Sequence, residues 1–132
     1  MREILFRGKR LDNGEWVEGY LYITHNGEHE ISIYNDEVNI ERWTHEVDPS
    51  TVGQYTGLTD KNGNRIWEGD ILRSCYDNLY PYDESIEVVK WFLNGWHIQQ
   101  GEYPPDAMDG DGVMPYSEVI GNIHDNPELL EK

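Results

Sequence analysis

Four Asn-Gly dipeptides divide this 132-residue chain: Asn13-Gly14, Asn26-Gly27, Asn62-Gly63 and Asn94-Gly95. Each lies between apolar runs that are short enough to be strands. Both residues of an Asn-Gly pair accept the positive φ of a type I′ turn, whose twist matches that of two antiparallel strands. The chain is therefore predicted to be all-β and built from consecutive antiparallel hairpins.

The stretch Tyr55–Leu72, YTGLTDKNGNRIWEGDIL, carries the densest pattern of this kind. Asn62-Gly63 predicts a type I′ hairpin, and Asp60 is placed to brace it. A short strand at Ile66-Trp67 follows, and the break at Glu68-Gly69-Asp70 leads into another apolar strand. This stretch predicts three strands joined by two tight turns.

Residues 1–50 are predicted to form an N-terminal antiparallel β-meander. The strand Trp16–Ile23 alternates, with Trp16, Tyr20 and Tyr22 on one face and Val17, Gly19, Leu21 and Ile23 on the core face. Glu30–Tyr34 and Val38–Trp43 are predicted as the next strands. Pro49 ends the region because proline has no N–H to donate to a strand ladder.

Residues 51–132 are predicted to form a second β region with acidic loops and a C-terminal tail. A hairpin joins Ile86–Phe92 to Trp96–Gln99, residues 76–85 and 101–115 are loops, and Val119–Ile123 is a short strand. Asn126-Pro127-Glu128 predicts a helical turn, with Asn as N-cap and proline at the first position. The expected core residues of this region are Val52, Leu58, Ile66, Ile71, Val88, Trp91, Ile98, Val119, Ile120 and Ile123.

The chain is strongly acidic, with 26 Asp and Glu against 10 Lys and Arg and a formal net charge of −16. Such a charge repels phosphate backbones, which makes direct binding to nucleic acid an unfavoured function. The single cysteine, Cys75, excludes an internal disulfide. No signal peptide and no membrane span are visible, so a cytoplasmic location is expected.

Several residue groups have the composition of a metal site. Asp60, Asn62 and Asn64 alternate as at the start of a calcium loop, but the sixth and twelfth positions are Arg65 and Ile71 instead of Gly and Glu. A hairpin turn is the better interpretation. His25 and His29 flank the second Asn-Gly pair, and two imidazoles without a third ligand make a poor metal site.

The sequence therefore predicts no metal, no cofactor and no catalytic residues, because none of the common catalytic motifs is present either. The remaining candidate is an interaction surface in the two loops. Aromatic side chains at a surface are typical of protein interfaces, and a flexible acidic loop offers oxygen ligands or charge. Its predicted members are Tyr76, Tyr80, Tyr82, Asp106, Asp109 and Asp111.

Three blocks of the sequence are distinctive: VGQYTGLTDKNGNRIWEGDIL (Val52–Leu72), IEVVKWFLNGW (Ile86–Trp96) and EVIGNIHDNPELL (Glu118–Leu130). In these blocks the chain resembles the YopX family of bacteriophage and prophage proteins. The resemblance implies a small SH3-like barrel within residues 51–132 and a gene carried by a phage or an integrated element. It implies no catalytic or binding residues, because the family is without an established biochemical function.

The function expected from these observations is that of a non-enzymatic binding or assembly module. Its partner would be a protein, either another copy of this chain or a host or phage protein. The alternative is an acidic decoy that imitates nucleic acid and occupies a host nucleic-acid-binding protein. A decoy would require carboxylates in rows on one surface, and the sequence does not arrange them in space.

Overall fold

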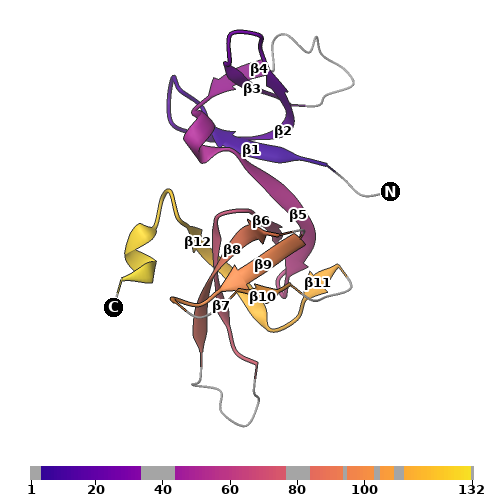
Figure 1. The fold of residues 1–132 in the computed structure, drawn as a ribbon, viewed down its shortest axis with the longest axis vertical. Helices are drawn as coiled ribbons and strands as arrows, with labels where there is room; N and C mark the ends of the chain where they lie inside the picture. Colours follow the sequence, from indigo (N-terminus) through magenta and orange to yellow (C-terminus); the bar gives the residue numbers. More distant parts are fainter. Residues whose placement is uncertain are drawn as a thin grey trace. The chain divides into compact units, whose positions relative to one another are not determined.

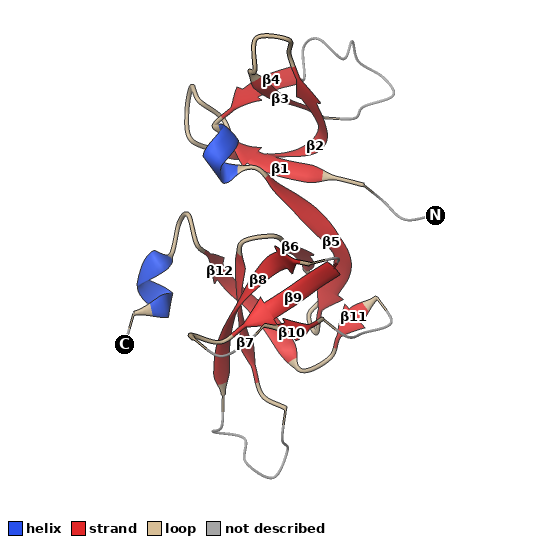
Figure 2. Cartoon of the chain, viewed as in Figure 1, coloured by secondary structure: helices blue, strands red, loops and turns tan. Residues whose placement is uncertain are grey.

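The protein is all-β. The structure, a computed structural model, describes residues 4–33, 44–76, 84–93, 95–102, 105–108 and 112–131 (Figure 1). The strands are β1 (Phe6–Lys9), β2 (Trp16–Ile23), β3 (His29–Ser32), β4 (Thr44–Val47), β5 (Gly53–Asp60), β6 (Arg65–Trp67), β7 (Asp70–Ser74), β8 (Ser85–Phe92), β9 (Gly95–Gln99), β10 (Asp106–Ala107), β11 (Val113–Met114) and β12 (Ser117–Asn122). The short 3₁₀ helices η2 (Pro49–Thr51) and η3 (Pro127–Leu130) are the helical segments of the described chain (Figure 2).

The chain divides into two compact units, Met1–Tyr55 and Thr56–Lys132, called here the N-terminal and C-terminal units. The sequence predicts this boundary between residues 50 and 51. In the structure it falls inside β5, whose first residues, Gly53 and Gln54, pair with β1.

Just after this boundary β5 is bent at Gly57, which has a φ of 88°. The Thr56 hydroxyl donates to the Ile66 carbonyl at 2.8 Å and accepts from the Leu58 N–H at 3.1 Å. The Thr56 side chain thus forms hydrogen bonds with the backbone next to the irregular position of β5. Glycine is suited to the bend because a Cβ atom disfavours positive φ.

The N-terminal unit is an antiparallel meander in which β1, β2, β3 and β4 pair in chain order. The strand ends of β1 and β4 are also linked, through an isolated bridge between Arg10 and Val47. Gly19 is required in the middle of β2, because a Cβ atom there would collide with the carbonyl oxygen of Ser32. The predicted meander is confirmed.

The core of this unit consists of Val17, Ile31 and Val47, with further apolar side chains packed around them. Val17 is on the core face, as predicted. Ile23 was expected there and is instead 52% exposed, because it lies at the end of β2 next to the hairpin loop. The predicted strand Val38–Trp43 lies outside the described residues.

The C-terminal unit contains a five-stranded antiparallel sheet in the order β10-β9-β8-β7-β12. The second half of β5 pairs with β6 and, in parallel, with β11. No closed barrel is formed by the strands that the structure describes. The core of the unit is made of Ile66, Leu72, Val89, Ile98 and Met114, with Leu58, Trp96, Met108 and Val119 packed against it.

The prediction of this core is right for Ile66, Ile71 and Ile98, which are buried. It is wrong for Trp91 and Ile123, which are 51% and 38% exposed. In β8 the buried residues are Glu87 and Val89, not the predicted Val88 and Trp91.

Glu87 and Val89 point inward in β8, whereas Val88 lies on the outer face and is half-buried. Ile120 is also half-buried, beside a β-bulge in β12. Val52 packs against the N-terminal core, so it was assigned to the wrong unit.

Two local predictions need correction. At Asn62-Gly63 only the glycine has a positive φ, so the turn is not type I′. The Gly63 N–H donates to the Asp60 carbonyl and the Asp60 N–H to the Asn64 carbonyl, which is the pattern of a three-residue hairpin loop with a glycine bulge. Residues 101–115, predicted as a loop, contain the short strands β10 and β11.

The predicted C-terminal helical turn is present as η3. Pro127 is its first residue, as expected, but the Asn126 side chain makes no capping hydrogen bond. Its Oδ1 atom accepts from the Asn122 N–H at 3.3 Å instead. Within the described part of the chain, no helix has the length and apolar character needed to cross a membrane.

Candidate functional site

An open groove lies on the outer face of the C-terminal sheet and has a volume of about 1130 Å³. Strand β8 and the end of β9 form its floor, and the segment that follows β12 forms a wall. Its lining residues are Glu84, Ile86, Val88, Lys90, Gln99, Gln100, Gly101, Glu102, Ile123, Leu129, Leu130 and Glu131. This surface is called the C-terminal groove.

The floor arises from the alternation of β8. Because successive side chains of a strand point to opposite faces, burial of Glu87 and Val89 leaves Ile86, Val88 and Lys90 on the outside. The Lys90 Nζ atom donates to Gln99 Oε1 on the neighbouring β9 at 2.8 Å. Two apolar side chains followed by one bridging cation therefore make the central strip of the floor.

The wall is held in place by the turn Asn122–Asn126. The Asn122 Oδ1 atom accepts from the N–H groups of His124 and Asp125, both at 2.9 Å. The Ile123 N–H donates to the carbonyl of Gly69, the residue just before β7, which fixes the turn to the sheet. Gly121 is needed beside this turn, because a Cβ atom there would meet the Asn126 side chain at 2.6 Å.

Beyond the turn, η3 presents its leucines to the groove without burying them. Leu130 is 42% exposed, and Leu129 and Ile123 are exposed to a similar extent. The charged side chains of the lining are Glu84, Glu102, Glu131 and Lys90, so three carboxylates surround an apolar floor that carries one ammonium group. This combination suits contact with another macromolecule or a large ligand.

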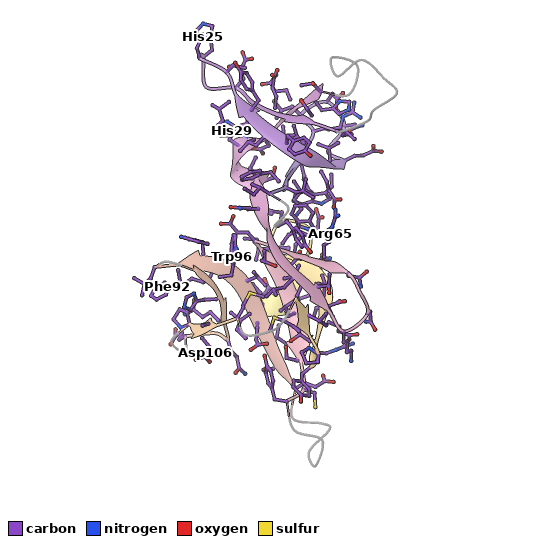
Figure 3. All side chains as sticks on the ribbon, turned by 90° about the vertical axis from the view of Figure 1, so that its right-hand side faces the viewer. His25, His29, Arg65, Phe92, Trp96 and Asp106 are labelled. Atoms are coloured by element: carbon purple, nitrogen blue, oxygen red, sulfur yellow. The ribbon has the colours of Figure 1, made fainter. Side chains whose placement is uncertain are left out.

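We searched the described residues for side chains that could bind a metal ion. They contain no group of three or more His, Cys, Asp or Glu side chains arranged to hold a metal ion. The two histidines considered above do not converge: His25 lies at the tip of its loop, away from His29 (Figure 3). The His29 Nδ1 atom is instead 3.1 Å from the carbonyl oxygen of Gly27.

Two of the six residues predicted as an interaction surface are described by the structure. Tyr76 follows β7 and Asp106 begins β10, so β8 and β9 lie between their strands in the sheet. The structure does not bring these two side chains into one patch. Tyr80, Tyr82, Asp109 and Asp111 lie outside the described residues.

Tyr76 takes part in a polar cluster at one end of the core. Its hydroxyl donates to the buried Glu87 carboxylate, with distances of 2.9 and 3.2 Å to the two oxygens. The hydroxyls of Ser74 and Ser117, both buried, lie 2.7 Å apart in the same region. Burial raises the pKa of the Tyr76 phenol above its ordinary value, and the charge of Glu87 adds to this rise.

A second surface lies on the outer face of the N-terminal sheet. Tyr20 and Tyr22 are exposed there, and the Trp16 ring lies under two cations, with Arg7 Cζ at 4.7 Å and Lys9 Nζ at 5.5 Å from its centroid. The expected aromatic face of β2 is thus present. The Trp16 end of this face is more covered than the Tyr22 end.

Sequence reasoning did not assign the C-terminal groove, although a signal for it was present. Ile86, Val88 and Lys90 alternate with Glu87 and Val89, and either set could have been the inner one. The sequence alone does not indicate that Glu87 is on the inner face, because an isolated buried carboxylate is costly. Its partner Tyr76 is eleven residues earlier in the chain and becomes visible only in the structure.

Comparison with known proteins gives a family and a fold. A crystal structure of protein EF1440 from Enterococcus faecalis has a TM-score of 0.53 and 22% identity, covering 99% of this chain and 100% of that chain. At this identity the likeness concerns the fold alone. No curated protein was found to match the sequence. The sequence profile described as YopX protein matches residues 5–131, nearly the whole chain, and the chain therefore belongs to the YopX family.

Proposed function

We propose that this chain is a non-enzymatic binding or assembly module whose partner is a protein. Its setting would be the cytoplasm of a bacterium that carries the corresponding phage or prophage. The observation that supports this function is the C-terminal groove, in which apolar side chains from β8 and from η3 converge and stay partly exposed. Burial of apolar surface is the main driving force of protein association.

The chemistry of the lining favours a protein over other ligands. Apolar side chains at the centre with charged side chains around them resemble the core and rim of a protein interface. Removing apolar surface from water contributes about 25 cal/mol per Å², so a few leucine and isoleucine side chains support specific binding. Phosphate-rich ligands are disfavoured, because Glu84, Glu102 and Glu131 would repel them.

An SH3-like barrel for the C-terminal unit is part of this proposal. Its support is the short antiparallel strands β7, β8, β9 and β12, which share one core with β5 and β6. Small β domains of this kind commonly bind through surfaces and loops that leave the core unchanged. An experimental structure of the whole chain in which these strands close into a barrel would support the assignment, and one in which β5 and β6 lie apart from the core of β7, β8, β9 and β12 would refute it.

The proposed function is tested with a matched pair of leucine variants. Leu130→Ser alters the groove, and Leu11→Ser makes the same change at an exposed position of the N-terminal unit. Light scattering over a concentration series and crosslinking in the producing cell would measure self-association and partner binding. We expect Leu130→Ser to remove the complex and Leu11→Ser to retain it; a strict monomer without any crosslinked partner would contradict the proposal.

One observation favours the acidic decoy as a second candidate. Glu30 and Glu46 are directly opposite each other on β3 and β4, although like charges in this position destabilise a sheet. A decoy would lose its partner to competing DNA and would weaken steeply as salt is raised. Arg7 and Lys9 on the same sheet interrupt the acidic surface. Partners that DNA does not displace would exclude the decoy.

A further inference from the structure

We infer that the occupant of the C-terminal groove is a short amphipathic α-helix of a partner protein, with apolar side chains on one face and Lys or Arg beside them. This inference rests on the proposed function and specifies its partner. It follows from three properties of the groove: the hydrogen bonding of its floor, the character of its lining and the sign of its charge.

The first property decides the conformation of the occupant. Strands β8 and β9 each have a neighbouring strand on both sides, in the order β10-β9-β8-β7. Their ladders use the backbone groups that an added strand would need. An extended peptide on the floor would therefore leave its own N–H and C=O groups without partners over an apolar surface, which is costly. A helix satisfies its backbone internally and needs only side-chain contacts.

The second property decides which face of the helix is bound. Ile86 and Val88 stand two residues apart on one face of β8, and Leu129 and Leu130 of η3 line the same groove. A helix lying between them would insert apolar side chains spaced three and four residues apart. Leucine, isoleucine, phenylalanine or methionine at these positions would be in contact with both the floor and the wall.

The third property decides the charge of the helix. The lining carries three carboxylates, of Glu84, Glu102 and Glu131, and a single cation, Lys90, which is bound to Gln99. The whole chain has a formal net charge of −16, which favours encounter with a basic partner. Lys or Arg on the flanks of the helix would lie beside the three carboxylates.

The same properties disfavour a second copy of this chain. The described residues contain no α-helix, only the 3₁₀ segments η2 and η3 of 3 and 4 residues. Two acidic chains also repel each other at an acidic groove. The occupant is therefore inferred to be a different protein.

The probe is a synthetic peptide of about 18 Leu and Lys residues in an amphipathic helical pattern, long enough to form a helix on binding. Two control peptides accompany it, one with the same composition in scrambled order and one with Glu in place of Lys. Each is titrated into the isotopically labelled full-length protein and followed by amide chemical shifts. We expect the amphipathic basic peptide alone to shift the amides of Ile86, Val88, Ile123, Leu129 and Leu130.

Variants of the protein show where the peptide binds. They also distinguish the contribution of charge to its affinity from that of apolar contacts. We expect Leu130→Ser to weaken the basic peptide about tenfold or more and Leu11→Ser to leave its affinity unchanged. Glu84→Gln and Glu131→Gln should each weaken it about 2- to 4-fold and reduce its dependence on salt. Glu28→Gln, an exposed glutamate in the N-terminal unit, is the matched charge control and should have no effect beyond a small change common to all sites.

Several outcomes would overturn the inference. These are equal binding of the scrambled or acidic peptide, chemical shift changes confined to the N-terminal unit, and an affinity that Leu130→Ser leaves unchanged. If no peptide binds while Leu130→Ser still removes the complex formed in cells, the helical basic partner is refuted and the proposed function stands. If Leu130→Ser changes neither measurement, both are refuted.

Discussion

Two hairpin loops of this protein have the same backbone and different surroundings. The loop Thr24–Glu28 joins β2 to β3, and the loop Asp60–Asn64 joins β5 to β6. In each, the N–H of the glycine donates to the carbonyl of the first residue, and the N–H of the first residue donates to the carbonyl of the last. A side-chain oxygen of the first residue accepts from the last N–H, at 3.1 Å in one loop and 2.9 Å in the other.

The difference is in what the first side chain does beyond its own loop. The Thr24 hydroxyl accepts a hydrogen bond from the Glu28 N–H of its own loop, in an exposed position. The Asp60 carboxylate is 1% exposed and accepts from the N–H groups of Asn62 and Val119, both at 2.9 Å. Val119 belongs to β12, which is 59 residues further along the chain. One loop closes a hairpin, whereas the other also fixes a distant strand.

The largest effect is expected from removing the Asp60 carboxylate. Asp60→Ala would leave the N–H groups of Asn62, Asn64 and Val119 without their acceptor. Hydrogen bonds to a charged group are worth about 1.5–3 kcal/mol each, with partial compensation by water, so we expect a total loss of about 2–4 kcal/mol. Chemical denaturation with amide exchange at Leu72 measures this loss in the C-terminal unit.

Exchange at Ile31 in the N-terminal unit serves as the internal control for this variant and should not change. If Asp60→Ala costs less than 1 kcal/mol, the carboxylate does not anchor β12, and the difference between the two loops has no energetic meaning.

The next prediction concerns acid. Burial alone would raise the pKa of Asp60, but the hydrogen bonds from the N–H groups of Val119, Asn64 and Asn62 outweigh it and lower the pKa below its usual value. Its stabilising contribution is therefore complete above the pKa of an unfolded Asp, about 3.9, and is lost as the pH falls from there through the folded pKa. Unfolding free energies between neutral pH and about pH 2 should show this loss, and Asp60→Asn should remove it. If the unfolding free energy of Asp60→Asn falls at low pH as much as that of the unchanged protein, Asp60 is not the cause of the loss.

Replacing the glycine of either loop by alanine should destabilise the protein equally. This prediction tests whether the two loops share one backbone conformation. Gly27 and Gly63 have φ values of 90° and 85°, and an added Cβ would meet no atom within 4 Å at either site. Alanine at each therefore costs only the strain of the left-handed conformation, about 1 kcal/mol. Thermal unfolding of Gly27→Ala and Gly63→Ala measures it. A difference between them well above about 0.5 kcal/mol, the usual error of additivity for independent sites, would show that their backbones are not equivalent.

The smallest effect is expected from Thr24→Ala. The N–H of Glu28 loses an acceptor, but it is exposed and can bond to water instead. We expect a destabilisation of about 0.5 kcal/mol, measured by exchange at Ile31. A cost similar to that of Asp60→Ala would remove the contrast between the loops.

The positions of these loops were predictable, because Asn-Gly between apolar runs marks a hairpin wherever it occurs. Their type was not. A two-residue and a three-residue loop use the same dipeptide, and the choice depends on the register of the strands on either side. Bracing by Asp60 was predicted and is confirmed by its bonds to Asn62 and Asn64. The hydrogen bond from Val119 to Asp60 could not be predicted, because the sequence around Asp60 does not indicate a contact with a residue 59 positions away.

The candidate groove was harder to predict than the fold. Alternation in β8 is visible in the sequence, but which face is buried depends on Tyr76 covering Glu87. Leu129 and Leu130 of η3 are partly exposed and line the groove. An apolar side chain in the sequence does not reveal whether its burial occurs within the chain or against a partner.

The bend of β5 at Gly57 has a consequence for how this chain can tolerate insertions. Boundaries between compact units usually fall in linkers, where added residues change little. Here the boundary falls within a strand, between the residues that pair with β1 and those that pair with β6 and β11. One residue added between Gln54 and Leu58 would reverse the alternation of the β5 side chains on one side of it relative to those on the other side. A fragment that stopped at residue 50 would likewise lose Thr51, whose hydroxyl accepts from the Lys9 N–H at 2.9 Å. The two units can therefore be exchanged or lengthened only together with the strand that both of them use.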